Sequence, residues 1–373
     1  MVHGSFDPDF APVVGAFERN FREHGEIGAS LQIVVGGRVS VDVWAGHADP
    51  ARTREWVKDT LVNAFSVGKG VTALVAAMCV AEGAFAYDDL VVDHWPEYGV
   101  HGKHRTTVRD LLGHRAGLPA LRARLPEGAM LDWELMTRAL AAERPWWEPG
   151  SAHGYHVNTF GFLVGEIIRR TTGSTVGRLV RERISGPFDV DVHLGCPDVL
   201  HERMADFEWP PMDLPRSEPP GLDEHQLMQL NTYYNPSGLS GGGVVNDPAW
   251  RRAEMPSTNL HASAEGVARL YRLILSGDLI PDSVLRDSLR QVSHGEDRVL
   301  GRISRFAHGW QVPIPERGFG PNPEAFGHYG AGGSVGFADP SAGVAFGYVM
   351  NQMGPRWQNP RNRGLIEALY GCL

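Results

Sequence analysis

The chain is organised around Phe65-Ser66-Val67-Gly68-Lys69-Gly70, which is followed by the apolar run 71–81 and by Gly83. Apart from Thr72 this run has no polar face, so it predicts one fully buried helix that begins at Ser66. Residues three positions apart in a helix are neighbours, roughly 5–6 Å apart at Cβ. We therefore expect the Ser66 hydroxyl and the Lys69 amine to touch in the first turn.

A serine and a lysine in this arrangement point to nucleophilic catalysis. The positive end of the helix and its free N–H groups stabilise an alkoxide and the oxyanion that forms after its attack. Of the 35 basic residues only three are lysines, namely Lys58, Lys69 and Lys103. A buried lysine can lose its proton near neutral pH, whereas arginine keeps it. The alternative is that Ser66 only caps the helix and that Lys69 is solvated.

The composition predicts a globular enzyme of two lobes, because 373 residues with 42% hydrophobic side chains can bury a large core. No apolar stretch reaches the ~20 residues of a membrane span, and the first residues lack a secretion signal, so we expect a cytoplasmic protein. Cys79, Cys196 and Cys372 are scattered and suit a reducing compartment. The net charge of −9 disfavours nucleic acid and anionic membranes as partners.

The two ends of the chain predict a common sheet. Apolar spacing predicts a helix over 10–26, and strands with a glycine turn between them over 30–35 and 39–44. Later strands are predicted at 307–312, 327–329, 334–338 and 344–350, before a helix over 363–370. Helices joined by Pro- and Gly-rich loops fill the middle, and residues 206–224, with five prolines, predict an irregular surface loop.

These elements predict an α/β (α+β) fold. An antiparallel sheet flanked by N- and C-terminal helices is built from residues 1–83 and 301–373. A mostly helical domain, residues 84–300, is inserted between its halves. We expect the active site in the cleft between the two domains.

Further motifs lie downstream of the Ser-x-x-Lys pattern. A tyrosine, Tyr155, follows a Pro-Gly turn and precedes a helix, as in the serine β-lactamase and penicillin-binding-protein superfamily, which this chain resembles. Within that superfamily several segments are similar to family VIII carboxylesterases, which share the class C β-lactamase fold. These segments are Trp95-Pro96-Glu97, His101-Gly102-Lys103, Leu111-Leu112-Gly113-His114-Arg115-Ala116-Gly117-Leu118-Pro119, Pro145-Trp146-Trp147-Glu148-Pro149-Gly150 and Gly165-Glu166-Ile167-Ile168-Arg169-Arg170.

The resemblance implies that Tyr155 hydrogen-bonds the nucleophile and works with Lys69 as general base. A phenol beside a cationic amine is stabilised as phenolate, so the pair could take the Ser66 proton and return it to the leaving group. The class C pattern has Tyr-x-Asn, but here Val157 takes the asparagine position and Asn158 follows one place later. We expect Asn158 to contact substrate, with amide-containing substrates held less well.

A third element, Gly327-His328-Tyr329-Gly330-Ala331-Gly332-Gly333-Ser334, stands where the superfamily has its Lys-Thr/Ser-Gly strand. The resemblance implies that His328, Tyr329 and Gly330 line the substrate site, and that the N–H groups of Ala331 and Ser66 form the oxyanion hole. His328 replaces the superfamily's lysine, which disfavours binding of a β-lactam carboxylate. Trp310 is a candidate wall of an acyl pocket, with core packing as the alternative.

Two other catalytic patterns are disfavoured. Gly332-Gly333-Ser334-Val335-Gly336 matches the nucleophile elbow of α/β-hydrolases, but no histidine follows Ser334, and residues 337–340 predict a strand and a turn rather than a helix. The 16 histidines include no His-Glu-x-x-His and no paired Cys/His set, so neither a metal nor another cofactor is expected.

The sequence thus predicts a serine carboxylesterase that acylates Ser66 with a short or medium acyl group from a small-molecule ester and deacylates with water. Transfer to another alcohol or amine would make the same enzyme an acyltransferase. A β-lactamase or D,D-peptidase is the alternative within the superfamily, and a catalytically silent binding protein is the alternative outside enzymes. The oligomeric state does not follow from the sequence.

Overall fold

A computed structural model describes residues 1–210 and 221–373 of the chain. The loop expected over 206–224 lies partly outside the described residues. Its first residues run beside the end of the sheet, where Glu208 bridges to Gln352, and its last one begins helix α9 (Glu224–Tyr234). Within the described ranges, no helix combines the length and the apolar character needed to cross a membrane.

The main sheet is antiparallel and combines both ends of the chain, which confirms the expected α/β fold class. Its strand order is β1-β3-β2-β11-β10-β9, so the N-terminal strand β2 pairs directly with the C-terminal strand β11. Strand bounds are β1 His3–Phe6, β2 Gly28–Val35, β3 Arg38–Gly46, β9 Phe326–Tyr329, β10 Val335–Asp339 and β11 Val344–Met350.

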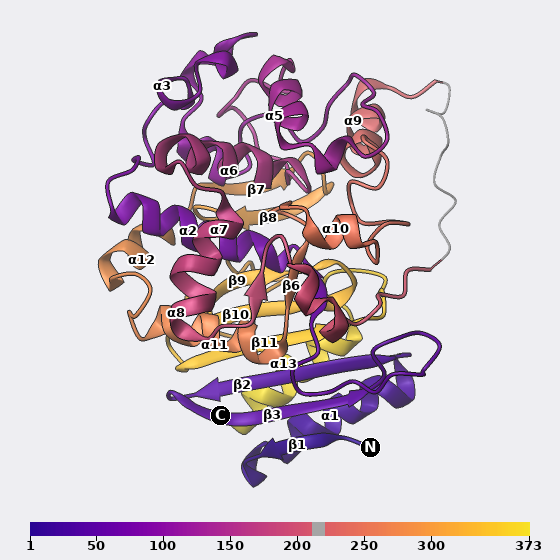
Figure 1. The fold of residues 1–373 in the computed structure, drawn as a ribbon. Coiled ribbons are helices and arrows are strands. Elements are labelled where there is room, and N and C mark those ends of the chain that lie inside the picture. Colours follow the sequence, from indigo (N-terminus) through magenta and orange to yellow (C-terminus); the bar gives the residue numbers. More distant parts are fainter. Residues whose placement is uncertain (211–220) are drawn as a thin grey trace.

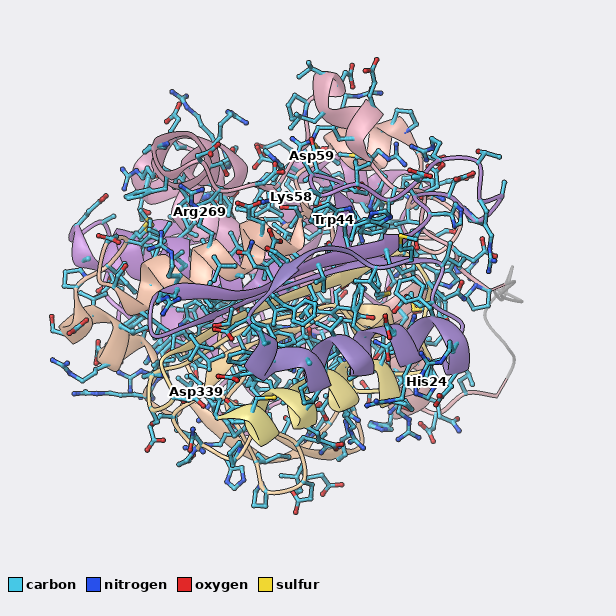
Figure 2. All side chains as sticks on the ribbon, turned by 90° about the horizontal axis from the view of Figure 1, so that it is seen from below. His24, Trp44, Lys58, Asp59, Arg269 and Asp339 are labelled. Carbon is cyan, nitrogen blue, oxygen red and sulfur yellow. The ribbon has the colours of Figure 1, made fainter. Side chains whose placement is uncertain are left out.

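Helices cover both faces of this sheet. The terminal helices α1 (Ala11–Glu23) and α13 (Pro360–Cys372) lie side by side on one face (Figure 2). Helix α11 (Ala264–Leu275) covers the other face so closely that a Cβ on Gly347 of β11 would lie 2.3 Å from the Ala264 carbonyl oxygen. Helix α11 thus packs on the sheet, although it lies within residues 84–300, the stretch predicted as the helical domain.

A second, three-stranded sheet leads into the buried helix. Its order is β4 (Val62–Phe65), β6 (Leu260–Ala262) and β5 (Val192–His193). Helix α2 (Val67–Ala81), labelled in Figure 1, follows β4 after Ser66. The remaining part of the middle of the chain forms further, mostly short helices. They are α3 Val91–His94, α4 Val108–Leu112, α5 Trp133–Ala142, α6 Thr159–Thr172, α7 Val176–Val180, α8 Gly186–Phe188, α10 Pro248–Arg252 and α12 Asp282–Ser288.

The structure has a two-stranded hairpin just before the place where one strand was predicted. Strands β7 (Ser293–Asp297) and β8 (Arg302–Phe306) pair antiparallel, whereas a strand was expected over 307–312. The predicted strand lies too late in the sequence. Strand β8 ends at Phe306, and the chain turns at Gly309, which has a φ of 86°. The hairpin joins residues on either side of the predicted boundary at 300.

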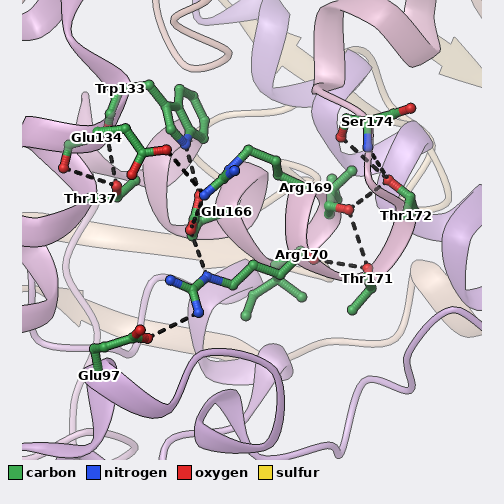
Figure 3. A network of polar contacts seen from close by, with 12 residues as sticks. Glu97, Trp133, Glu134, Thr137, Glu166, Arg169, Arg170, Thr171, Thr172 and Ser174 are labelled. Atoms are coloured by element: carbon green, nitrogen blue, oxygen red, sulfur yellow. Dashed lines mark hydrogen bonds and ion pairs between the residues drawn. The ribbon is translucent and has the colours of Figure 1, made fainter.

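A buried carboxylate fastens the helical part together. Glu166 of α6 accepts hydrogen bonds from Trp133 Nε1 (2.8 Å), Arg169 Nε (2.8 Å) and Arg170 Nε (2.6 Å), and Arg170 also pairs with Glu97 at 3.0 Å (Figure 3). The charge of Glu166 is therefore fully compensated, and α6 is tied to α5 and to the loop at Glu97.

A second buried ion pair fixes the turn at 331–333. Arg361 of α13 bonds Glu26 at 2.8 Å, and Tyr348 also donates to Glu26. The same guanidinium donates to the Gly332 carbonyl oxygen at 2.8 Å, next to a bond from Asn359 Nδ2 at 2.9 Å. Gly332 has a φ of 80°, which favours glycine, so its backbone is held in place by side chains of the C-terminal helix.

Replacing Arg361 should strongly destabilise the fold. Arg361→Met leaves the Glu26 carboxylate buried without its cation, which typically costs about 3–5 kcal/mol. Urea unfolding followed by circular dichroism should show a clearly lower midpoint. Arg363→Met, on the exposed side of the same helix, is the control and should stay near the wild-type midpoint. Equal midpoints for the two variants would contradict this role of the ion pair.

Candidate active site

Ser66 lies at the junction of strand and helix. The preceding Phe65 ends β4 with a φ of 50°, a strained conformation for a residue with a side chain, and Ser66 occupies the N-cap position of α2. Its hydroxyl makes no capping bond to the helix, so the interpretation of Ser66 as a simple cap does not hold. The hydroxyl is left available for chemistry at the positive end of α2.

The Lys69 amine is fully buried one turn later. Its Nζ lies 3.1 Å from Ser66 Oγ, 2.6 Å from the Val157 carbonyl oxygen and 3.0 Å from the Ser257 carbonyl oxygen. A neutral amine has two N–H groups for the two carbonyls and a lone pair that can accept the Ser66 proton. Burial lowers the pKa of Lys69 well below its ordinary value. This geometry suits a lysine that acts as a general base.

Close packing brings the Ser257 carbonyl to the amine. The segment holding Ser257 lies between α2 and α6, where a Cβ on Gly161 would come within 2.6 Å of the Ser257 backbone nitrogen. Thr72 of α2 also donates to the Pro256 carbonyl oxygen at 3.2 Å. The two acceptors of Lys69 are therefore backbone atoms of fixed position.

Tyr155 lies beside this pair, as expected. Its ring centroid is 4.8 Å from Lys69 Nζ, and the side chain is fully buried against Phe306 and Trp357. The phenol oxygen faces the Ser66 hydroxyl without completing a well-directed hydrogen bond. Ser66, Lys69 and Tyr155 are thus brought together.

The protonation of Tyr155 differs from the expectation of a phenolate. Burial raises the pKa of the phenol well above its ordinary value, Tyr233 and Asp297 add to the shift, and the Ser66 hydroxyl opposes it. Burial acts in opposite directions on an amine and a phenol because it disfavours the charged form of each. Burial therefore favours the uncharged form of both groups, an amine on Lys69 and a phenol on Tyr155.

A buried carboxylate that the sequence did not reveal positions Tyr155. Asp297, at the end of β7, accepts from the Tyr155 backbone N–H at 3.0 Å. It also accepts from the N–H groups of Val299 and Leu300 and from the Ser304 hydroxyl, at 3.0, 2.9 and 2.8 Å. Four donors on one fully buried carboxylate fix the tyrosine relative to the β7–β8 hairpin.

Buried histidines surround the tyrosine. His156 accepts from the Leu118 N–H at 3.0 Å and donates to the Gly154 carbonyl oxygen, and burial lowers its pKa to about 3. His114 Nδ1 accepts from the backbone N–H of His156 at 3.1 Å, and the His114 ring packs edge-on against the Tyr155 ring. Neutral imidazoles add polar groups here without adding charge.

The strand β9 brings His328 to the site. His328 pairs with Gly336, and cross-strand partners share a face, so its ring lies on the α2 side and stacks 5.9 Å from Tyr155. Burial lowers the pKa of His328, and the nearby Lys69 acts in the same direction. A Cβ on Gly330 would lie 2.2 Å from the Ala64 carbonyl oxygen, so β9 ends directly against β4, two residues before Ser66.

Three residues predicted to contact substrate have other partners. Tyr329 lies on the opposite face of β9, where its hydroxyl donates to the Gly318 carbonyl oxygen at 2.8 Å. Trp310 is a core residue packed against Phe326, with its indole N–H directed at Ser288 Oγ (3.3 Å).

Asn158 is the third of these residues. Its amide donates to the Thr232 carbonyl oxygen and Ser240 Oγ, at 2.8 and 2.9 Å, and accepts from Thr258 Oγ1 at 2.9 Å. Its hydrogen-bonding groups are thus engaged within the protein. Sequence position gave no indication of where these side chains point, because each depends on distant partners.

Ser334 is not placed as a nucleophile elbow. It is fully buried and enters strand β10 instead of a helix. The elbow requires a strand, a sharp turn and a helix in that order.

Comparisons of the sequence and of the structure with known proteins agree with each other. The sequence model of the β-lactamase family matches residues 16–370. The chain is 34% identical over 370 residues to "Esterase/beta-lactamase LipL" of Mycobacterium tuberculosis, covering 94% of this chain and 83% of that protein. A crystal structure of a family VIII carboxylesterase superposes with a TM-score of 0.91 at 35% identity, and a penicillin-binding protein homolog from Caulobacter crescentus with 0.90 at 37%; both cover 100% of either chain.

The reactivity of Ser66 should follow the deprotonation of Lys69. Because the base works only when neutral, labelling by a fluorophosphonate should rise with pH through the pKa of Lys69. It should level off well below ~10.4, the value of an exposed lysine. Mass spectrometry of the labelled protein gives the rate. Lys69→Arg should nearly abolish labelling, whereas Lys58→Arg, an exposed residue paired with Asp42 (Figure 2), should not change it. A profile still rising at pH 10 would exclude a desolvated base.

Asp297→Asn should slow the same labelling reaction. An amide offers fewer acceptor sites to the four donors, so Tyr155 shifts, and a misplacement of about 1 Å can cost roughly 100-fold in rate. The control is Glu296→Gln, which changes the exposed acid next to it on β7. Equal rates for both variants, with unchanged thermal stability, would remove Asp297 from the positioning of Tyr155.

Proposed function

Since the chain belongs to the β-lactamase family, we propose that it cleaves short- to medium-chain carboxylic esters through an acyl intermediate on Ser66. It is a serine hydrolase of this fold, and its neighbours include carboxylesterases. One observation carries the proposal for Ser66. The Lys69 amine, 3.1 Å from Ser66 Oγ, has backbone carbonyls for its two N–H groups and a lone pair left for the serine proton.

The proposed reaction begins with transfer of the Ser66 proton to Lys69. The Ser66 oxygen then attacks the ester carbonyl, and the N–H groups of Ser66 and Ala331 stabilise the oxyanion. Tyr155 gives its proton to the departing alkoxide and recovers one from the protonated Lys69 beside it. Water repeats these steps on the acyl-enzyme and releases the carboxylic acid. Another alcohol as acceptor would give acyl transfer by the same steps.

Two features favour simple esters over β-lactams. The Asn158 amide is occupied by Thr232, Ser240 and Thr258, so it is not free to hold the amide side chain of a lactam. His328 is buried, with its pKa lowered, and offers no positive charge to a lactam carboxylate. We propose that substrate reaches Ser66 from a cleft between the sheet part, 1–83 and 301–373, and the helical part, 84–300.

We also propose a cytoplasmic location. The cysteines Cys79, Cys196 and Cys372 are all free thiols, which is compatible with a reducing compartment.

Steady-state kinetics test this function. Ser66→Ala should abolish hydrolysis of p-nitrophenyl butyrate, whereas Ser334→Ala should keep most of it, because only Ser66 has an amine one turn away. Wild-type kcat/KM should be higher for the butyrate than for a chromogenic cephalosporin. Faster turnover of the cephalosporin would contradict the esterase assignment while leaving Ser66 as the nucleophile.

A further inference from the structure

Among the described residues, the half-buried Arg302 has no counter-ion, and it lies near Tyr155. The guanidinium of Arg302, on β8, lies 5.1 Å from the ring centroid of Trp357, and that ring lies 4.9 Å from the ring of Tyr155. No more than about 10 Å therefore separates the guanidinium from the phenol ring. Among residues 1–210 and 221–373, the Arg302 side chain has neither a hydrogen bond nor an ion pair.

Other arginines increase the positive charge around Arg302. Burial lowers the pKa of Arg302, and the positive charges of Arg317 and Arg356 act in the same direction. Arg305 and Arg317 line the same narrow slot of about 50 Å³ beside Trp357. Within the described part of the chain, their guanidinium groups bond neutral oxygens, those of Pro313 and Gln291 for Arg305 and that of Ile303 for Arg317.

The acidic group nearest in sequence does not neutralise this cluster. Asp297 attracts Arg302, but its oxygens accept from Tyr155, Val299, Leu300 and Ser304. By contrast, the arginines of the Glu166 network in Figure 3 are all paired with carboxylates. In a chain with a net charge of −9, a partly buried group of unpaired cations is unfavourable until an anion binds it.

The cluster lies close to Tyr155, which in the proposed reaction protonates the departing oxygen. A group this close to Tyr155 is within reach of a substituent on the alcohol part of the ester. Trp357 packs on Tyr155 and Arg302 lies over Trp357, which forms an apolar wall ending in a cation. A planar guanidinium suits a carboxylate, which it can bind through two parallel hydrogen bonds.

We propose that Arg302, supported by Arg317 and Arg356, binds a carboxylate on the alcohol part of the substrate. The preferred substrates are then esters of hydroxy acids, whose hydrolysis releases a hydroxy acid and a short- or medium-chain carboxylic acid. This inference rests on the proposed esterase function and names its substrate class.

Matched esters test the inference. 4-Butyryloxybenzoate carries a carboxylate on the leaving phenol, and 4-butyryloxybenzamide is its neutral analogue of similar shape. At low salt the wild-type enzyme should prefer the benzoate in kcat/KM by about tenfold or more, and the preference should shrink as salt is added. Arg302→Gln should bring the ratio of the two kcat/KM values close to one, whereas Arg302→Lys, which keeps the charge, should retain part of the preference.

Two controls make the result decisive. Arg290→Gln removes an exposed arginine paired with Asp287, away from the slot, and should keep the wild-type ratio. Arg356→Gln removes a supporting charge and should lower the ratio partly. A wild-type ratio of one or less, with normal Ser66-dependent hydrolysis of the benzamide, would overturn the inference and leave the esterase function intact. Failure to hydrolyse either ester would contradict both.

Discussion

The removal of one amine from water is the constraint on which the active site depends. Lys69 is the first-turn residue of a helix buried on all sides, and the atoms it meets are two carbonyls and the Ser66 hydroxyl. Among the described residues no carboxylate contacts the amine, and burial lowers the pKa of Lys69. The same burial keeps the Tyr155 phenol protonated. One physical effect, desolvation, therefore favours the uncharged form of both groups, while backbone geometry fixes the oxygen that the Lys69 amine faces.

The groups around the amine come from distant parts of the chain. The hairpin residue Asp297 holds the Tyr155 backbone, and helix α13 holds the turn that contains Gly332 through Arg361. Both anchors are buried charged groups that hydrogen-bond backbone atoms of these segments. Such groups contribute less to net stability than apolar packing of equal volume, but they specify one arrangement of the turns that carry the site. The rings of Phe306 and Trp357 then pack against Tyr155, and the half-buried Arg302 lies over the Trp357 ring.

Local sequence signals predicted much of this structure. The Ser66–Lys69 spacing, the apolar helix and the glycine hairpin depend on neighbours within a few residues, and each lies where it was expected. Asp297 could not be found this way, because its donors include an N–H group 142 positions away, and an isolated acid at a strand end reads as a surface residue. Asn158 and Trp310 were predicted to contact substrate because their contacts within the protein cannot be read from the sequence. Their internal partners, Thr232 and Phe326 among them, are visible only in three dimensions.

The pairing of β2 with β11 has a consequence for biosynthesis. Val35 and Ala29, at the ends of β2, lie opposite Val344 and Met350, so the sheet cannot close until almost the whole chain has left the ribosome. Pairings of such large sequence separation form slowly, because the intervening loop must be ordered first. The β2–β3 hairpin meanwhile has an unpaired edge that can associate with other chains. In the proposed mechanism, a nascent chain that already carries Ser66 and Lys69 still lacks β9, so we expect it to hydrolyse esters only after its last strands are made.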